Sequence, residues 1–515
     1  MWQIHYRCIA VHGSGYNPRM RFELIAAVDL GSNSFRLQVG RVEGNQIYPL
    51  DGLKESVRLA AGLNEQKQLD DAAQKRGFDA LSRFGERLRG FAPDAVRAVA
   101  TNTLRVAKNA PEFLECAEHL LGFPIEVIAG REEARLIYLG VAHTLPNPSR
   151  QQLVVDIGGG STECIIGRDM HPLVLESLYM GCVSYTLKFF PDGHVDRKSF
   201  KEAELAARRE LQAMVHPFRE LGWDEAIGSS GTAKALIDLL ELNGFCKHGI
   251  TRDGLEKLRD CLCDAGNLAK VKLEGLRSDR IPVLPGGLAI MLAVFKELDL
   301  QQMEFSEGAL RLGVLYDLLG RYHHEDLRAA TVMHFMQRYQ VDPAQALRVE
   351  RTAVDLLHQL VPATADEDHP DRQFLTWAAK LHEIGVSVAH SSYHKHSAYI
   401  LSHADMPGFS KRDQARLARM VLAHRGKLER AQPLKGEAAE WTLIFCLRIA
   451  VLLHRSHDAS PPPKIAVSFY ESGFMLELDA ERLSAAPLTA AALADEAAQW
   501  AGVGGALKIV VGDGR

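Results

Sequence analysis

Short apolar runs that end in polar, glycine-rich turns recur along the first 320 residues. Residues 24–28 are apolar, Asp29 and the turn GSNS at 31–34 follow, and apolar alternation resumes over residues 35–42. This pattern predicts a strand, a tight turn and a second strand. It returns 127 residues later, where residues 153–155 precede Asp156 and the turn GGGST at 158–162. The repeat of D-[LI]-G-x-x-S predicts a duplicated α/β lobe with two turns facing each other across a cleft.

The segments around this repeat also alternate between strand and helix patterns. Apolar residues recur at helical spacing in three segments, and three short apolar runs predict further strands. The predicted helices cover residues 72–88, about 132–139 and 200–222, and the predicted strands cover residues 96–100, 124–128 and 225–227. A third turn, GSSGT at 228–232, separates the last of these strands from a helix that begins at Ala233.

The pattern changes at about residue 323, from where amphipathic helices with many histidines continue to about residue 458. The run SPPP at 460–463 predicts a boundary. The tail alternates over 465–470 and 474–478, and then shows an alanine-rich helix and a strand over 507–511. We therefore predict a polar extension over residues 1–23, lobe I over 24–140, lobe II over 141–320, a helical domain over 321–459 and a small α+β domain over 460–515. Met20 is an alternative start of translation.

Composition narrows the function classes. A chain of 515 residues predicts three or four domains, and 47% hydrophobic and 24% charged residues are ordinary for a globular protein. The formal net charge of -5 gives no global basic field, so we expect no nucleic-acid partner. The eight cysteines lack C-x2-C spacing, which predicts reduced thiols.

No secretory signal or apolar span of about 18 residues is present, so we expect a cytoplasmic protein. Peripheral association with the inner membrane surface is left open, because no amphipathic basic helix demands it.

The three glycine-, serine- and threonine-rich turns are candidate phosphate-binding sites. Glycines let backbone N–H groups approach phosphate oxygens closely. One such turn alone is typical of a tight hairpin, whereas three of them, two in a repeat, favour phosphate binding. The candidate residues are Gly31, Ser32, Asn33 and Ser34, then Gly158, Gly159, Gly160 and Ser161, then Gly228, Ser229, Ser230, Gly231 and Thr232.

Asp29 and Asp156 end their strands beside two of these turns, where carboxylates can hold Mg²⁺ directly or through water. The alternative is an Asx-turn in which the carboxylate caps local amides. Because the arrangement is repeated, we favour the metal.

Further charged residues are candidates for the chemistry. Glu132 and Glu133 open a helix, where one of them stabilises the helix dipole and the other is a candidate general base. Glu163 follows the second turn and is a candidate to hold metal or orient water; its alternative is an exposed strand position. Arg58 and Arg105 are candidates to neutralise phosphoryl oxygens, although most arginines serve packing or the surface.

These motifs together resemble the exopolyphosphatase/guanosine pentaphosphate phosphohydrolase (Ppx/GppA) family over nearly the whole chain from about Leu24. The motifs are DLGSNSFRL at 29–37, TNTLR at 101–105, REEARLIYLG at 131–140, DIGGGSTE at 156–163, MGCVS at 180–184, GSSGT at 228–232 and SEGALRLGVLYD at 306–317. The resemblance implies the fold of the superfamily of sugar kinases, actin and the large heat-shock chaperones. The expected fold is thus an α/β actin-like (ribonuclease H-like) duplicated core, followed by an all-α HD-like domain and a small α+β domain.

The resemblance also assigns roles to residues. It implies that Glu133 is the general base, that Glu163 assists with metal and water, and that Asp29 and Asp156 hold metal. The family contains long-chain exopolyphosphatases and phosphatases of the pentaphosphate alarmone. The turn GGGS, where alarmone-preferring relatives carry GGAS, and the segment HSSYHKHSAYIL at 390–401 favour the first branch.

The helical domain carries the segment LHEIG at 381–385, which is similar to the HD phosphohydrolase motif but has Glu383 in place of the aspartate. His358, His394 and His396 are further candidate metal ligands. Because Val451 occupies the place of a later aspartate, we favour a structural or binding role for this domain, including a path for polyphosphate.

The predicted function is Mg²⁺-dependent hydrolysis of the terminal phosphate of inorganic polyphosphate, with a groove extended across a homodimer. The alternatives are hydrolysis of guanosine pentaphosphate by the same site, an ATP-dependent kinase on the same fold, and a non-catalytic sensor of polyphosphate or alarmone. Glu133 and Glu163 favour a hydrolase over the last two alternatives.

Overall fold

The structure is a computed structural model that describes residues 22–43, 46–146, 149–322, 327–367, 369–429, 438–457, 465–484 and 486–512. The chain divides into two compact units, with the division after Asp326. Almost all of the predicted N-terminal extension, including Met20, and the proline run at 460–463 lie outside the described residues.

The first sheet belongs to the N-terminal half of the first unit. Its five strands are arranged in the order β3-β2-β1-β4-β5, in which β1 pairs antiparallel with β2 and parallel with β4. Their bounds are β1 (Leu24–Leu30), β2 (Phe35–Glu43), β3 (Gln46–Glu55), β4 (Val96–Ala100) and β5 (Ile125–Val127). The predicted strand–turn–strand is therefore present, and we call this sheet sheet I.

The second sheet repeats the same topology. Its six strands follow the order β10-β11-β9-β6-β7-β8, so that β6 again pairs antiparallel with the next strand and parallel with β9. We call it sheet II, with β6 (Gln152–Ile157), β7 (Thr162–Arg168), β8 (His171–Leu178), β9 (Glu225–Ser229), β10 (Ile250–Thr251) and β11 (Gln302–Phe305). The two sheets confirm the duplicated α/β core that the sequence repeat predicts.

Strand alternation gives each sheet an inner and an outer face. In β1, Ala26, Val28 and Leu30 contribute to one apolar cluster, while Ile25 and Ala27 contribute to another that also contains Val154 of β6. The second cluster joins the two sheets, so we call its side the inner face. Asp29 follows Ile25 and Ala27 at the same two-residue spacing, so the strand places it on the inner face.

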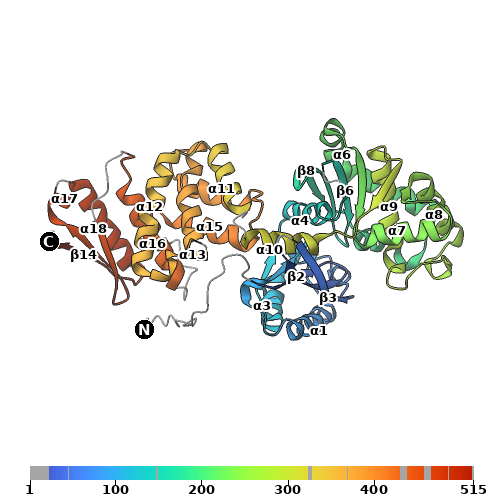
Figure 1. The fold of residues 1–515 in the computed structure, drawn as a ribbon, viewed down its shortest axis with the longest axis horizontal. Helices are drawn as coiled ribbons and strands as arrows, with labels where there is room; N and C mark the ends of the chain where they lie inside the picture. The colour runs from blue at the N-terminus through green and yellow to red at the C-terminus, as the bar shows by residue number, and fades with distance from the viewer. Residues whose placement is uncertain are drawn as a thin grey trace. The chain divides into compact units, whose positions relative to one another are not determined.

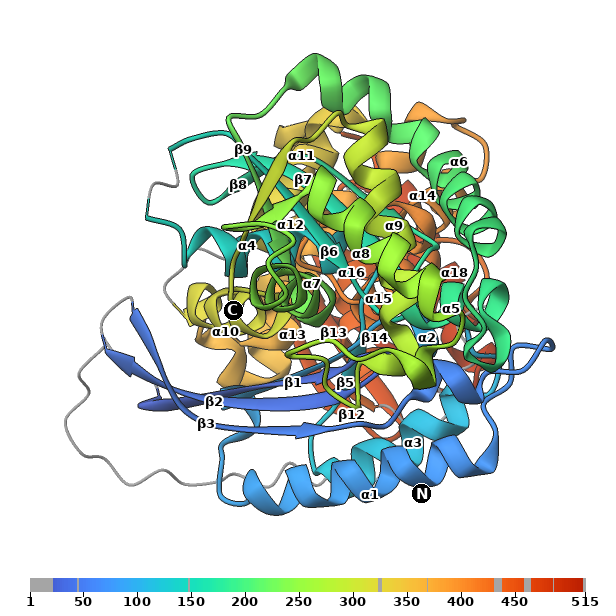
Figure 2. The same ribbon diagram turned by 90° about the vertical axis from the view of Figure 1, so that its right-hand side faces the viewer.

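Helices cover the outer face of each sheet (Figures 1 and 2). Buried residues of α1 and α3 pack on sheet I, and buried residues of α5 to α9 pack on sheet II. The helices of lobe I are α1 (Asp71–Arg87), α2 (Asn102–Val106) and α3 (Ala110–Leu121). Those of lobe II are α5 (Cys182–Phe189), α6 (Arg197–Leu221), α7 (Ser230–Leu242), α8 (Arg252–Ala265) and α9 (Leu284–Glu297).

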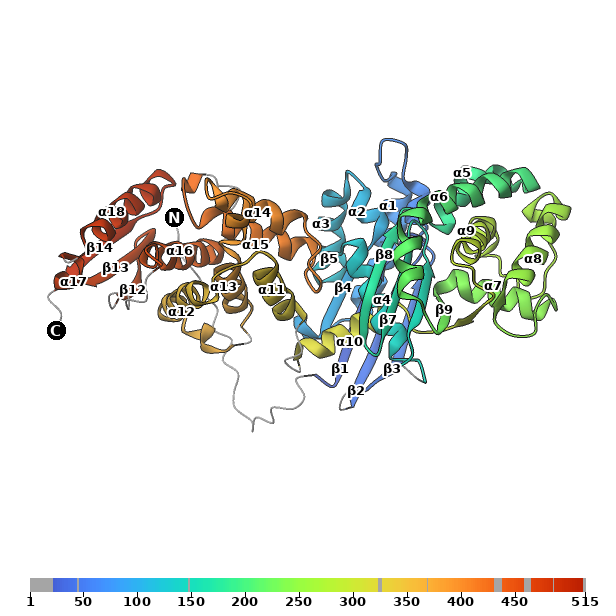
Figure 3. The same ribbon diagram turned by 90° about the horizontal axis from the view of Figure 1, so that it is seen from above.

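Two helices, α4 (Gly130–Ala142) and α10 (Leu310–Tyr322), lie between the inner faces of the sheets (Figures 1 and 3). α4 follows sheet I in the chain but contacts β7 and β8, whereas α10 follows sheet II but contacts β1 and β2. The predicted lobe limits at residues 140 and 320 therefore fall inside these two helices, and each lobe borrows a helix from the other half of the sequence.

The second unit consists of helices and a small sheet around one apolar core. Its helices are α11 (Leu327–Arg338), α12 (Pro343–Leu360), α13 (Pro370–Leu381), α14 (Tyr393–His403), α15 (Lys411–Ala423), α16 (Ala438–Leu453), α17 (Ala480–Ser484) and α18 (Pro487–Gly502). The sheet contains β12 (Ile465–Tyr470), β13 (Gly473–Asp479) and β14 (Leu507–Gly512) in that order. This confirms a helical domain followed by a small α+β domain. Within the described ranges, no helix combines the length and apolar character needed to cross a membrane.

Candidate active site

Four carboxylates converge between the two lobes. Asp29 lies near the end of β1 and Asp156 near the end of β6, and Glu163 of β7 pairs in register with Asp156. Glu133 enters the same cleft from the first turns of α4. All four side chains line one cavity of about 420 Å³, which is within the size range of small-molecule sites.

Burial dominates the electrostatics of these carboxylates. It raises the pKa of Glu133 to about 7, although Arg105 opposes the shift. It raises the pKa of Asp156 to about 6, against hydrogen bonds from Ser229 and Ser230 that lower it. Burial also raises the pKa of Asp29, and it raises that of Glu163 well above its usual range with the help of Glu133 and Asp156. Burial and like charges that shift several pKa values in one cleft are typical of a functional site.

The two repeated turns face each other at very short range. A Cβ atom on Gly159 would lie 3.0 Å from Cβ of Ser32 and 3.2 Å from the backbone nitrogen of Asn33. Thr103 of α2 donates a 2.8 Å hydrogen bond to the Ser32 hydroxyl. A Cβ atom on Gly160 would lie 2.5 Å from Oδ1 of Asn102, so both glycines of the second turn are tightly packed against lobe I. Both turns line the cavity that holds the carboxylates, although Gly160 does not, and their binding of phosphate stays a prediction.

The third predicted turn is a direct strand-to-helix junction rather than a loop. Gly228 and Ser229 are the last residues of β9, and α7 begins at Ser230, which adopts a left-handed backbone with φ of 75°. Ser229 is not among the residues that line the cavity, and its hydroxyl donates to the Gly308 carbonyl at 2.8 Å. Ser230, Gly231 and Thr232 do line the cavity. The N-terminus of α7 thus replaces the predicted loop, because strand pairing continues two residues further than the apolar run.

The remaining charged residues that the sequence predicts for the site differ in their burial and in their distance from the cavity. Arg105 Nη1 donates to Glu133 Oε2 at 3.2 Å and to the Ile128 carbonyl at 2.8 Å, so it holds the glutamate rather than lining the cavity. Arg58 is exposed and does not line the cavity. Glu132 is buried and pairs with Arg135 at 2.7 Å. Glu163 is buried, not an exposed strand residue, and accepts a 2.8 Å hydrogen bond from Ser177.

Six cations that sequence reasoning missed line the cavity: Arg36, Lys54, Lys234, Arg277, Arg280 and Arg311. Arg36 pairs in register with Asp29, just as Glu163 pairs with Asp156. Burial and the nearby Arg311 lower the pKa of Arg36 to about 10. The sequence repeat could have found Arg36, because it stands seven residues after Asp29 and Glu163 stands seven residues after Asp156. Lys54 of lobe I forms a 3.0 Å ion pair with Asp279 of lobe II across the cleft.

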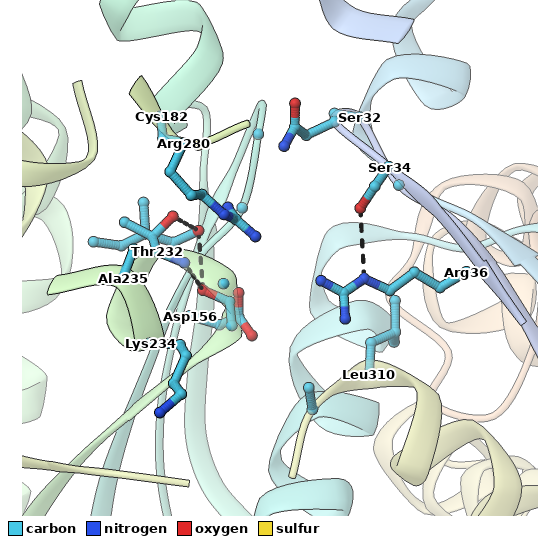
Figure 4. A pocket seen from close by; sticks show the side chains of 18 of the residues that line it. Ser32, Ser34, Arg36, Asp156, Cys182, Thr232, Lys234, Ala235, Arg280 and Leu310 are labelled. Carbon is cyan, nitrogen blue, oxygen red and sulfur yellow. Dashed lines mark hydrogen bonds between the residues drawn. The ribbon is translucent and has the colours of Figure 1, made fainter. Parts of the chain in front are cut away.

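Figure 4 shows the distribution of charge around this space. Asp156 and Thr232 lie on the side of lobe II together with Lys234 and Arg280, while Ser34 and Arg36 approach from lobe I. Ser34 Oγ accepts a 3.5 Å hydrogen bond from Arg36. Cationic side chains thus surround an acidic centre, which suits an anion that arrives together with a divalent cation.

The donor set fits Mg²⁺ bound jointly with substrate. Asp29 Oδ1 is a buried oxygen without a hydrogen-bond partner, which is unusual for a carboxylate unless a cation or ligand satisfies it. In the ranges that the structure describes, no three His, Cys, Asp or Glu side chains form a complete metal cage. Mg²⁺ commonly uses one or two carboxylates together with waters and substrate phosphates, so a complete cage is not required.

The histidines of the helical domain lie in a different environment. His382 and His424 are buried, and their Nδ1 atoms lie 2.6 and 2.5 Å from the carbonyls of Ala379 and Val421, three residues earlier in each case. Burial lowers the pKa of both rings. His358 is exposed and His394 is buried. This geometry integrates the two buried rings His382 and His424 into the helical core.

Two lobes that share the order of five strands, with acidic residues at equivalent strand ends, define an actin-like fold. An exopolyphosphatase from Cytophaga hutchinsonii shares this fold with a TM-score of 0.53 and 23% identity, over 57% of this chain and 97% of the other. The Ppx/GppA phosphatase family matches residues 38–322, and domain III of the same family matches residues 327–497. The chain therefore belongs to the Ppx/GppA phosphatase family.

The chain is also similar in sequence to two proteins over almost the whole length of both chains. The chain is 37% identical to the guanosine-5'-triphosphate,3'-diphosphate pyrophosphatase of Vibrio vulnificus, over 94% of this chain and 98% of the relative. It is 39% identical to the protein of the same name from Vibrio cholerae over the same shares. The family and the fold predicted from sequence are confirmed. The names of these relatives favour the predicted alternative, guanosine pentaphosphate, over polyphosphate.

Proposed function

We propose that this protein removes the terminal 5' phosphate of guanosine 5'-triphosphate 3'-diphosphate. Water attacks the γ-phosphorus, the bond to the bridging oxygen breaks, and guanosine tetraphosphate and inorganic phosphate leave. The observation that carries this proposal is the similarity, over almost the whole of both chains, to two proteins named for this compound. The carboxylate cluster and the cationic cleft support it.

Binding of the triphosphate is assigned to the glycine turns and the cavity cations. The backbone of the turns at 31–34 and 158–161 and the N-terminus of α7 supply N–H groups and a favourable helix dipole. Arg36, Arg311 and Arg280 supply positive charge next to the acidic centre. Most of the catalytic effect in phosphoryl transfer comes from such positioning and charge stabilisation.

Glu133 is the proposed general base. It faces the cleft, and its pKa, raised to about 7 by burial, suits proton abstraction near neutral pH. Arg105 holds one carboxylate oxygen at 3.2 Å and thereby limits the rotation of the side chain. Glu163, which Ser177 holds in turn, lies next to Asp156 on the neighbouring strand and is proposed to orient the attacking water.

Asp29, Asp156 and Glu163 are the candidate ligands of Mg²⁺, of which one or two would hold the ion together with waters and substrate phosphates. When bound, the ion neutralises phosphate oxygens and stabilises charge on the leaving group. The three carboxylates keep the site acidic. Asp29 Oδ1 has no hydrogen-bond partner within the protein, so it is available as a ligand.

Inorganic polyphosphate is the second candidate substrate. It shares the phosphoanhydride bond, and the GGGS turn at 158–161 and the segment at 390–401 favour it. Both substrates would use the same carboxylates, so the choice between them depends on the ends of the cleft rather than on its centre.

The test is phosphate release from guanosine pentaphosphate and from long-chain polyphosphate, measured side by side with Mg²⁺ for wild type, Glu133→Gln and Glu176→Gln. Glu133→Gln should lower kcat by about 10²–10⁴-fold because the base is lost. Glu176→Gln, which removes a carboxylate of β8 outside the cavity, is the matched control and should retain activity.

The outcomes separate the alternatives. Preference of the wild type for the pentaphosphate supports the proposal. Preference for polyphosphate would instead place the protein among the exopolyphosphatases, without affecting the roles assigned to the site residues. Release from neither compound by folded protein would refute the hydrolase and favour a sensor. Equal activity of Glu133→Gln and wild type would refute the assignment of the base.

A further inference from the structure

Helix α7 extends the cleft away from the phosphate turns. The cavity is lined by Ser230, Gly231 and Thr232 at the start of the helix, and then by Lys234, Ala235, Asp238 and Leu239. These positions recur every three to four residues, so they form one face of the helix. Seven residues separate Gly231 from Asp238, and at about 1.5 Å per residue the helix advances by roughly 10 Å between them. The face therefore leads from the triphosphate site to a second end of the cleft.

The chemistry of this second end differs from that of the phosphate site. Leu239 is buried, and Leu276 and Phe305 are half-buried beside the cavity. The Lys234 ammonium lies 5.5 Å from the centre of the Phe305 ring and 2.8 Å from Asp238 Oδ1. Apolar walls beside a carboxylate that is paired with a lysine suit a flat ring that carries hydrogen-bond donors.

Asp238 differs in position from the other acidic side chains that line the cavity. Four of the six are the carboxylates of the proposed catalytic centre, and the other two are Asp238 and Glu307. Of these two, Asp238 lies on the helix face that begins at the phosphate site, and Lys234 donates a charge-assisted hydrogen bond to it.

Guanine presents two adjacent donors, N1–H and the N2 amino group, on one edge of its ring. A carboxylate has two acceptor oxygens and no donor, so it can accept from both. Adenine has an acceptor at N1, and hypoxanthine lacks the amino group. We propose that Asp238 recognises the guanine edge of the substrate while Leu239 and Leu276 contact the ring. This inference rests on the proposed function and deepens it, because it assigns the residue that selects the base.

The test compares kcat/KM for the 5'-triphosphate 3'-diphosphates of guanosine, inosine and xanthosine in the full-length protein. Wild type should prefer guanosine over inosine by about 10–100-fold, since inosine lacks the amino donor that the carboxylate of Asp238 would accept from. In Asp238→Ala this preference should be lost. In Asp238→Asn the preference should move from guanosine to xanthosine, because the amide N–H can donate to the O2 of xanthine.

A matched control exists on the next helix. Asp253 of α8 forms the same i to i+4 pair with Lys257, at 2.6 Å, but does not line the cavity. Asp253→Asn should keep the wild-type ratio of guanosine to inosine. Each ratio is measured on one preparation, so partial loss of folded protein cancels.

Three results would overturn the inference. One is an unchanged guanosine preference in Asp238→Ala, and another is equal rates for guanosine and inosine in the wild type; both leave the proposed function standing. The third is absence of phosphate release from every nucleotide by wild type, which would refute the proposed function together with the inference.

Discussion

At the scale of single residues, the burial of the acidic centre carries a cost in stability at neutral pH. Asp156 is 6% exposed, and burial raises its pKa in the folded protein to about 6. In the unfolded chain the pKa is about 3.9. The folded state therefore favours the protonated carboxyl, and this contribution to stability is present below about pH 4 and is lost as the pH rises through about 6.

Replacement of Asp156 by Asn should accordingly stabilise the protein in the absence of divalent cations. With EDTA at pH 8 we expect the free energy of unfolding to increase by about 1–3 kcal/mol, since a neutral amide avoids the burial of a charge. At pH 4 the gain should disappear. Thermal unfolding at both pH values measures it, with Asp253→Asn as the surface control. A gain that is the same at pH 4 and pH 8 would contradict the explanation.

The site residues differ in how far sequence could predict them. Asp29, Asp156 and the glycines of the first two turns stand in a repeated motif, and strand alternation suffices to place both aspartates on inner faces. Arg280 and Arg311 carry no such signal, because they reach the cavity only through the packing of lobe II and α10. Arg58 lies close to the motif in sequence, yet its side chain is exposed beside the first lobe.

At the scale of elements, the crossing of α4 and α10 holds the two lobes together. A Cβ atom on Gly313 would collide with the Leu136 carbonyl, and one on Gly140 would collide with the Ala309 carbonyl. Asp317 of α10 joins Arg135 of α4, at 2.5 Å, to Arg97 of β4, at 2.7 Å. Close backbone contact and buried ion pairs therefore fix the helix on which Glu133 stands.

Substitution of Gly313 by Ala should disturb this crossing strongly. The backbone offers no room for a methyl group, so we expect a loss of about 2–4 kcal/mol in the free energy of unfolding, despite the higher helix propensity of alanine. Gly502→Ala in α18 has nothing within 4 Å of the added methyl group and should be neutral or slightly stabilising. Chemical unfolding of the two variants compares them, and equal stability would refute the packing argument.

Most elements follow from periodicity and turn chemistry, but their partners do not. The predicted helix over residues 200–222 corresponds to α6, and the strands of the small terminal sheet were predicted within one or two residues. Local hydrophobic patterns cannot predict that α4 contacts β7 and β8 while α10 contacts β1 and β2. This exchange depends on contacts between residues far apart in the chain.

At the scale of the whole molecule, the cavity belongs to one of the two compact units. Every residue that lines it stands between Asp29 and Arg311, within the unit that ends at Asp326. The Cytophaga hutchinsonii protein, which matches 57% of this chain, is covered to 97% by that match.

A variant that ends at residue 326 should fold without the second unit. We expect one cooperative thermal transition, because the three apolar clusters of the two lobes lie entirely within the retained residues. Asp156→Asn should raise this transition by the same amount as in the full chain. Aggregation or a non-cooperative melt would show that the second unit is needed for folding.

The substrate branch could not be decided from sequence motifs. The GGGS turn and the histidine-containing segment at 390–401 suggested polyphosphate, while the full-length relatives are named for the alarmone. Under the proposed mechanism both substrates would use the same central carboxylates, so we expect the residues that discriminate between them at the ends of the cleft. The predicted homodimer and its extended groove stay predictions.

The exchange of helices between the lobes also determines when the protein can fold during synthesis. Ile25 and Ala27 of β1 share their apolar cluster with Leu310, Val314 and Leu315 of α10. The ribosome completes β4 about 210 residues before it reaches Leu310, which takes roughly 10–40 s at 5–20 residues per second. During that interval the first sheet has emerged without the helix that covers its inner face. The nascent chain must therefore keep an apolar surface protected until the last helix of the unit arrives.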